Sequence, residues 1–227
     1  MQFTPEMKVL GEIIQYGLYF PQIAIAYLAI QVELILVAVA LTVFFALVIG
    51  GAGLYLFLPA YIANMVPVGA SALFRRLGWR NAPIWESRLG RNKTWVGTSA
   101  GLLATMFAAW AQTEFEKKFP FVGGLRPEGV RTMPWPFFGL LMGVGALVIG
   151  DMAKSLVKRT FGIAPGKPWK PWDDLDYGFG TSVVLLPFVW QQPHMLVPMA
   201  AGVAIGYYAN PIVNRLSHRA GVKAVPH

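Results

Sequence analysis

The chain has 227 residues, of which 56% are apolar and only 13% are charged, and it contains no cysteine. Soluble domains carry about 25% charged residues, so this composition excludes an ordinary soluble protein, while the lack of cysteine excludes disulfides, thiolate catalysis and thiolate metal sites. The formal net charge of +8 does not by itself indicate a nucleic-acid partner, because a membrane protein needs cationic loops to fix its orientation.

The first predicted region covers residues 1–31. An apolar stretch over residues 7–29 contains scattered polar side chains and Pro21. Proline inside a helix removes a hydrogen bond and distorts the helix, so this region is predicted to be either an interfacial helix or an additional span. The N-terminus has Glu6 and Glu12 beside a single Lys8, and it lacks a basic start followed by a short apolar run and a cleavage site, so we predict no signal peptide.

Residues 32–227 are predicted to form a single membrane-embedded domain with about five transmembrane helices, each needing about 20 apolar residues. The apolar runs that suggest these helices lie at residues 32–60, 95–112, 134–150, 178–191 and 195–209. Gly139, Gly143 and Gly150 place small residues along one side of the third run, where another helix is expected to approach closely. The predicted fold class is therefore an all-α polytopic membrane protein.

The distribution of charge predicts how the chain crosses the membrane. Lysine and arginine are in excess in residues 69–94, in the segment after Gly150 and in the C-terminal tail, whereas acidic residues nearly balance them in residues 113–133. Cytoplasmic loops carry the excess of positive charge. The first three regions are therefore predicted to be cytoplasmic and the fourth to lie outside.

The end of the first apolar run contains two prolines and an asparagine. Pro59, Asn64 and Pro67 at this depth predict a broken helix whose freed backbone groups line a polar cavity. The alternative is a kinked helix end with Asn64 as its C-cap.

The second apolar run is preceded by Asn92, Lys93 and Thr94. Backbone N–H groups at a helix N-terminus, together with such side chains, suit an anion. The glycine spacing of a Walker loop is absent. The alternative is a basic flank in which Asn92 or Thr94 caps the helix.

The third run continues into Asp151, Ser155, Lys158 and Arg159. Their spacing puts all four on one face of a helix. A carboxylate, a hydroxyl and two cations would then converge on one point. The alternative is a positively charged flank with Asp151 in an ion pair.

The fourth run is preceded by Asp173, Asp174 and Asp176, which are the remaining aspartates of the chain. Three carboxylates so close together repel one another unless a basic cluster or Mg²⁺ lies between them. The proline-rich residues 165–171 are predicted to form a turn that folds them back toward Asp151. The alternatives are a solvated acidic loop and a helix N-cap at Asp173 or Asp174.

These four segments, in this order, resemble the CDP-archaeol synthase family, the integral membrane cytidylyltransferases related to the CDP-diacylglycerol synthases. The resemblance covers roughly residues 54–227. It implies transfer of CMP from CTP to an ether-lipid phosphate, unsaturated archaetidic acid, with CDP-archaeol and pyrophosphate as products. The implied partners are CTP, the lipid phosphate and membrane lipids, with no nucleic acid, and a homo-oligomer is left open.

The resemblance also implies a Mg²⁺-dependent site and a role for each matching residue. The expected metal ligands are Asp151, Asp173 and Asp176. The residues expected to stabilise the transition-state charge with Asp151 and its metal are Lys93, Lys158 and Arg159. Other residues expected to bind substrate or shape the cavity are Asn64, Asn92, Thr94, Ser155 and Asp174.

Three other functions remain compatible with the sequence. The first is the same chemistry on ester-linked phosphatidate, which gives CDP-diacylglycerol. The second is a small ion-coupled transporter with a path formed by Asn64 and the aspartates. The third is a lipid-binding or assembly factor without catalysis, which would release no pyrophosphate from CTP.

Overall fold

The computed structural model of the chain describes residues 5–164 and 167–221. Within these ranges the structure contains helices and no strand, and its one β-bridge joins Pro83 to Thr94. This confirms the all-helical part of the predicted fold class. The chain divides into two compact units, Met1–Val48 and Ile49–His227. The second unit carries the candidate site.

The first unit is helical over its described residues, as part of α1 (Pro5–Arg76). A candidate membrane-spanning stretch begins at Tyr19, and side chains such as Phe20, Ile23 and Leu36 are exposed. Exposed apolar side chains in such number suit contact with lipid. The choice between an interfacial helix and an additional span, and the domain boundary after residue 31, stay predictions.

The helix break predicted around Asn64 is wrong, because α1 continues through both prolines to Arg76. Proline at position 59 cannot donate to the carbonyl four residues earlier, that of Tyr55. This carbonyl accepts a 2.6 Å hydrogen bond from Nε2 of Gln112 on α3 (Trp95–Lys118). A neighbouring helix thus supplies the donor that Pro59 lacks, and the helix does not need to break.

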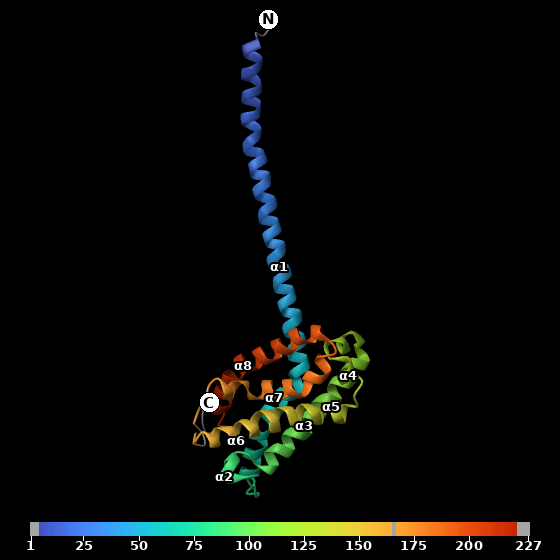
Figure 1. Cartoon of the computed structure of the whole chain (residues 1–227), viewed down its shortest axis with the longest axis vertical. Coiled ribbons are helices and arrows are strands. Elements are labelled where there is room, and N and C mark those ends of the chain that lie inside the picture. The colour runs from blue at the N-terminus through green and yellow to red at the C-terminus, as the bar shows by residue number, and fades with distance from the viewer. Residues whose placement is uncertain (1–4, 165–166, 222–227) are drawn as a thin grey trace. The chain divides into compact units, whose positions relative to one another are not determined.

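The centre of the second unit is one continuous helical rod made of α5 (Trp135–Gly143), a π-helical segment η2 (Val144–Met152) and α6 (Ala153–Thr160). In Figure 1, α7 (Trp172–Val189) and α3 lie on either side of this rod.

Glycines allow both contacts with the rod. A Cβ atom added to Gly180 of α7 would lie 2.1 Å from the carbonyl oxygen of Gly145, and one added to Gly139 would lie 2.4 Å from the Cα of Met106 on α3. The predicted close approach of other helices along these small residues is confirmed.

The last long helix, α8 (Leu196–Arg219), follows a short 3₁₀ turn, η3 (Pro193–Met195), and packs on α7. It also approaches α1 closely, since a Cβ atom on Gly53 would lie 2.6 Å from the backbone nitrogen of Gly202. The shorter elements are α2 (Glu86–Leu89), η1 (Pro120–Leu125) and α4 (Glu128–Arg131).

An apolar core joins these helices. Leu56, Phe57, Phe138, Met142 and Leu185 are fully buried in it. Four of the predicted apolar runs each overlap one long helix, and the run at residues 134–150 overlaps α5 and η2 of the rod. Three stretches among the described residues are long and apolar enough to cross a membrane, and these are Tyr19–Arg76, Trp135–Thr160 and Pro193–Arg219. The number of about five spans therefore stays a prediction.

A buried polar cluster holds together the end of the helix bundle that contains residues 113–133, the segment predicted to lie on the outer side of the membrane. Arg126 is 3% exposed and forms an ion pair with Glu116, which also accepts a 2.8 Å hydrogen bond from the Tyr55 hydroxyl. The guanidinium carbon of Arg126 lies 4.7 Å from the ring centroid of Phe138. This cluster ties η1 to α1, α3 and α5.

Candidate active site

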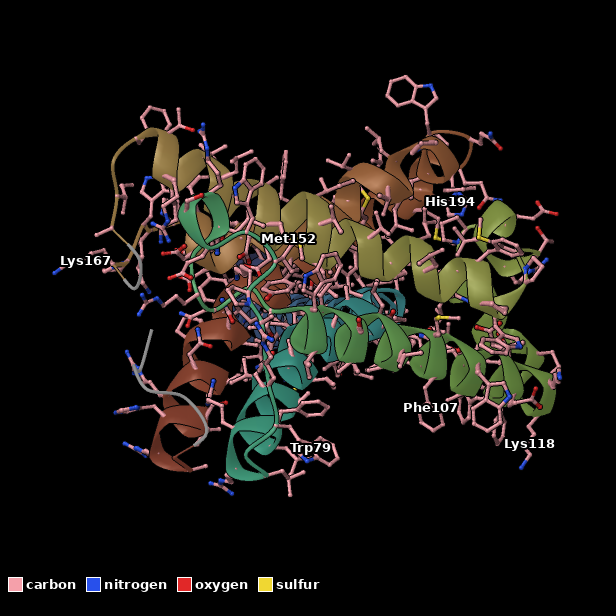
Figure 2. The ribbon with its side chains drawn as sticks, turned by 90° about the horizontal axis from the view of Figure 1, so that it is seen from below. Trp79, Phe107, Lys118, Met152, Lys167 and His194 are labelled. Atoms are coloured by element: carbon pink, nitrogen blue, oxygen red, sulfur yellow. The ribbon has the colours of Figure 1, made fainter. Side chains whose placement is uncertain are left out.

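A cavity of about 560 Å³ opens at one end of the second unit. Figure 2 shows this end with Lys167 labelled, while Lys118 and His194 mark the opposite end of the bundle. Every residue predicted for the site lines this cavity: Asn64, Asn92, Lys93, Thr94, Asp151, Ser155, Lys158, Arg159, Asp173, Asp174 and Asp176. The structure therefore brings together segments that lie far apart in the sequence, and the roles of the individual residues stay predictions.

Asp151 lies in the π-helical segment of the rod and is buried. Its carboxylate accepts a hydrogen bond from the ammonium of Lys93, which precedes α3. One turn later, the Ser155 hydroxyl donates a 2.8 Å hydrogen bond to the Asp151 carbonyl. Asp151 is thus in an ion pair, as the alternative prediction had it. Its partner, Lys93, is itself a predicted site residue.

Three carboxylates meet at the ammonium of Lys154. Its Nζ atom lies 3.6 Å from Asp151 and 3.2 Å from Asp173, and it donates a hydrogen bond to Asp176. The acidic cluster is thus folded back onto the rod, as predicted. Sequence reasoning did not assign Lys154 to the site, although it stands on the same helix three residues after Asp151.

The turn between α6 and α7 is closed by Lys158 and Asp173. The Lys158 ammonium lies 3.0 Å from the Asp173 carboxylate and donates a 2.7 Å hydrogen bond to the Lys167 carbonyl. The same carboxylate accepts a 2.5 Å hydrogen bond from the Trp169 backbone. Of the proline-rich turn, residues 165–166 lie outside the described residues.

Asp174 contacts Lys170, which precedes α7, and Asn210 of α8. Its carboxylate lies 3.0 Å from the Lys170 ammonium, and Asn210 of α8 lies 3.5 Å from it. Asn210 also accepts a 3.1 Å hydrogen bond from Asn64. Because the N-cap position of α7 is Pro171, neither Asp173 nor Asp174 is the N-cap. Sequence reasoning missed Asn210, since nothing near it in the chain marks it as functional.

In the loop before α3, Thr94 caps the helix and the neighbouring Lys93 contacts Asp151. Thr94 is the N-cap, accepting a 3.1 Å hydrogen bond from the Gly97 backbone and lying 3.1 Å from the Ser71 hydroxyl. The capping alternative is therefore correct for Thr94. The cap fixes the preceding backbone, so that Lys93 reaches Asp151.

Arg159 lies at the end of α6 facing this loop. One of its terminal nitrogens donates to the Ile163 carbonyl, and another would be 3.5 Å from a Cβ atom on Gly90. Its Nε atom is buried and has no hydrogen-bond partner in the described part of the chain. An anion in the cavity could accept this bond.

The acidic residues that begin α7, ahead of the predicted span, differ in their pKa. Burial raises the pKa of Asp176 to about 6 against the attraction of Lys154. For Asp173, burial is outweighed by Lys154, Lys158 and the Trp169 backbone, which hold its pKa below its usual range. The pKa values of the two carboxylates therefore shift in opposite directions, although both contact Lys154.

The cavity wall has more positive than negative charge. Eight lysines and arginines line it against four aspartates, an excess of four formal charges. Each aspartate contacts a lysine, in the pairs Lys93–Asp151, Lys154–Asp176, Lys158–Asp173 and Lys170–Asp174. The excess comes from Arg75, Arg91, Lys167 and Arg159, of which Arg91 forms an ion pair with Glu86, a residue outside the cavity lining. Such a wall suits a polyanion.

Comparison with known proteins decides the family. Residues 44–227 match the protein-family model described as CarS-like, CDP-archaeol synthase. The chain belongs to the CDP-archaeol synthase family. It is a nucleotidyltransferase of lipid synthesis, and the resemblance noted in the sequence is confirmed.

Individual CDP-archaeol synthases match over about three quarters of the chain. The one from Aeropyrum pernix is 33% identical over 175 residues, covering 75% of this chain and 88% of the relative. The one from Thermofilum pendens is 31% identical over 185 residues, covering 74% and 77%. The one from Methanosphaerula palustris is 30% identical over 179 residues, covering 74% and 99%. No solved structure matches the chain.

The carboxylate oxygens in this cavity are of the type that Mg²⁺ binds. Among residues 5–164 and 167–221, no group of three or more His, Cys, Asp or Glu side chains is arranged to hold a metal ion. Mg²⁺ is usually bound through one or two carboxylates together with substrate phosphates. The Mg²⁺ site at Asp151, Asp173 and Asp176 therefore stays a prediction.

A second, smaller cavity of about 180 Å³ adjoins the first. Its lining comes from α1, α7 and α8 and is mainly apolar, with residues such as Leu54, Ile205 and Val213. It shares Asn64, Asp174, Tyr177 and Asn210 with the larger cavity. The larger polar cavity and the smaller apolar cavity thus share the wall that these four residues form.

Proposed function

We propose that this member of the CDP-archaeol synthase family transfers CMP from CTP to an ether-lipid phosphate, unsaturated archaetidic acid. The products are CDP-archaeol and pyrophosphate. The observation that carries the proposal is the cavity in which an excess of four positive charges surrounds four aspartates. This charge suits a triphosphate, and the names of the relatives indicate the lipid.

The reaction needs positioning and positive charge rather than a general base. A phosphate monoester has a second pKa of about 6, so the lipid phosphate is largely dianionic at neutral pH. Its oxygen attacks the α-phosphorus of CTP, and the bond to the departing pyrophosphate breaks. Because the reactants are both anions, cations must offset their repulsion.

The lysines and arginines of the cavity supply this charge. Lys93 and Lys158 each present an ammonium at the wall, held by Asp151 and Asp173 respectively. Arg159 has a buried Nε–H without a partner in the described residues, which a phosphate oxygen would accept. Asn92, Thr94 and Ser155 are assigned to hydrogen bonds with the nucleotide.

Mg²⁺ would be held by Asp151, Asp173 and Asp176 and would neutralise charge on the triphosphate when bound. The same aspartates also form ion pairs that orient Lys93, Lys154 and Lys158. Asp176 is 5% exposed, and its carboxylate accepts a hydrogen bond from the Lys154 ammonium. Asp174 borders both cavities and is assigned to substrate binding.

The apolar cavity supports the lipid side of the proposal. A lipid whose chains lie against Leu54 and Ile205 would present its phosphate at the wall formed by Asn64 and Asn210. The basic segments around the large cavity support an opening on the cytoplasmic side of the membrane. CTP would reach the site from there.

The direct test is release of pyrophosphate from CTP by the purified protein, offered ether-linked and ester-linked lipid phosphates in parallel. We expect turnover with unsaturated archaetidic acid and slower turnover with phosphatidate. Faster turnover with phosphatidate would identify a CDP-diacylglycerol synthase instead. Absence of pyrophosphate with every lipid would contradict cytidylyl transfer altogether.

A further inference from the structure

Lys154 occupies the point on which the acidic residues of the site converge. Its ammonium contacts Asp151, Asp173 and Asp176, the same three residues assigned to the metal. The lysine side chain is only 15% exposed. The ammonium donates a hydrogen bond to Asp176, and its positive charge also lies close to the carboxylates of Asp151 and Asp173.

This arrangement makes a metal ion a competitor of the lysine in the free protein. A divalent cation that entered alone would have to lie beside the Lys154 ammonium or displace it from the carboxylates. The first arrangement is opposed by repulsion between like charges, and the second leaves a nearly buried ammonium without its partners. Neither is favourable when no other anion is present.

A bound triphosphate changes this balance. Its oxygens can accept hydrogen bonds from Lys154, as they can from Lys93 and Lys158 on the same wall. Carboxylate oxygens of Asp151, Asp173 and Asp176 would then be free to hold the metal together with the phosphates. Nucleotide and metal would therefore enter together.

We propose that Lys154 is a positioning residue that holds the place of the metal ion in the nucleotide-free protein. By contacting Asp151, Asp173 and Asp176, two of which also pair with Lys93 and Lys158, it keeps free Mg²⁺ from binding until CTP arrives. The inference rests on the proposed function, because it takes the triphosphate as the ligand that moves the lysine.

The test is calorimetric titration of the detergent-purified protein with MgCl₂, in the absence of nucleotide and lipid, for the wild type and for Lys154→Met. We expect the wild type to bind Mg²⁺ weakly until CTP is added. The variant should bind Mg²⁺ without CTP at least about tenfold more tightly. Lys154→Arg keeps the charge and should behave like the wild type.

Thermal unfolding gives a second measurement that does not depend on activity. Without metal, Lys154→Met should unfold at a lower temperature than the wild type, because the carboxylates repel one another. MgCl₂ alone should restore the variant and leave the wild type unchanged. A merely structural lysine would predict a loss that MgCl₂ does not restore.

Lys117→Met is the matched control. Lys117 forms an exposed ion pair with Glu114, also three residues away along a helix, and does not line the cavity. It should change neither metal binding nor its dependence on CTP.

Tight binding of Mg²⁺ by the nucleotide-free wild type would overturn the inference, even if Lys154→Met fails to fold. So would equal affinity of the wild type and Lys154→Met. Either result can occur while the wild type still releases pyrophosphate from CTP, which would leave the proposed function standing. Conversely, a protein that fails to release pyrophosphate but shows the expected metal binding would contradict only the proposed reaction.

Discussion

Asp151 is buried and held from two directions, by the Lys93 ammonium and by the helix that carries it. Replacement by asparagine keeps the shape of the side chain and removes its charge. We expect Asp151→Asn to fold and to lower kcat/KM for cytidylyl transfer by at least about 100-fold. The measurement is pyrophosphate release by the purified, monodisperse variant. More than about a tenth of wild-type activity would rule out Asp151 as a metal ligand.

Arg159 presents a planar guanidinium in a position where shape matters as well as charge. Lysine keeps the charge but loses the paired donors that match a phosphate. We therefore expect Arg159→Lys to lower kcat/KM by at least about tenfold. Arg219→Lys at the end of α8 is the control for the exchange itself. Equal turnover of Arg159→Lys and the wild type would mean that Arg159 acts only as a distant point charge.

At the scale of elements, the contact between Arg126 and Glu116 fixes the end of the bundle remote from the cavity. Their side chains are 1% and 10% exposed. Removal of one partner of a buried ion pair costs about 3–5 kcal/mol, because the other charge is left unpaired. Glu116→Gln should lower the free energy of unfolding by this amount, measured by chemical denaturation in detergent.

The control is Glu114→Gln, which removes an exposed partner from the pair with Lys117. Its effect should stay within about 1 kcal/mol. If the two variants were equally stable, Arg126 would have another partner that compensates for the loss of Glu116.

The contact of α7 with the rod depends on glycine. A methyl group on Gly180 would lie 2.1 Å from the carbonyl oxygen of Gly145, so Gly180→Ala must push the helices apart. We expect loss of stability and of activity together, because α7 carries Asp173, Asp174 and Asp176. Gly50→Ala, where nothing lies within 4 Å of the added atom, should keep or raise the melting temperature. A Gly180→Ala variant as stable and active as the wild type would contradict this packing.

The sequence was sufficient to predict these helices and the segments that meet at the cavity, because apolar length and local charge are local properties. It was insufficient where distant residues decide. Pro59 suggests a break, yet Gln112 on another helix supplies the missing donor. In the same way, Asn210 becomes part of the site only through contacts with Asn64 and Asp174, which lie on other helices.

At the scale of the whole molecule, the family match begins at residue 44. Removal of residues 2–43 leaves 33 residues of α1, which at 1.5 Å per residue extend about 50 Å and can still cross a membrane. We expect the shortened protein to fold and to keep cytidylyl transfer. Activity of the shortened protein should be compared with that of the full chain in the same lipid. A large loss would assign the first residues a role in the reaction.

The π-helical segment Val144–Met152 determines the direction in which the side chains of the following helix, α6, point. Such a segment accommodates an extra residue relative to α-helical winding. Deleting a single residue there would turn α6 by about 100° about its own axis. Ser155 and Lys158 would then turn away from their places on the cavity wall, so the position of both side chains depends on one surplus peptide unit.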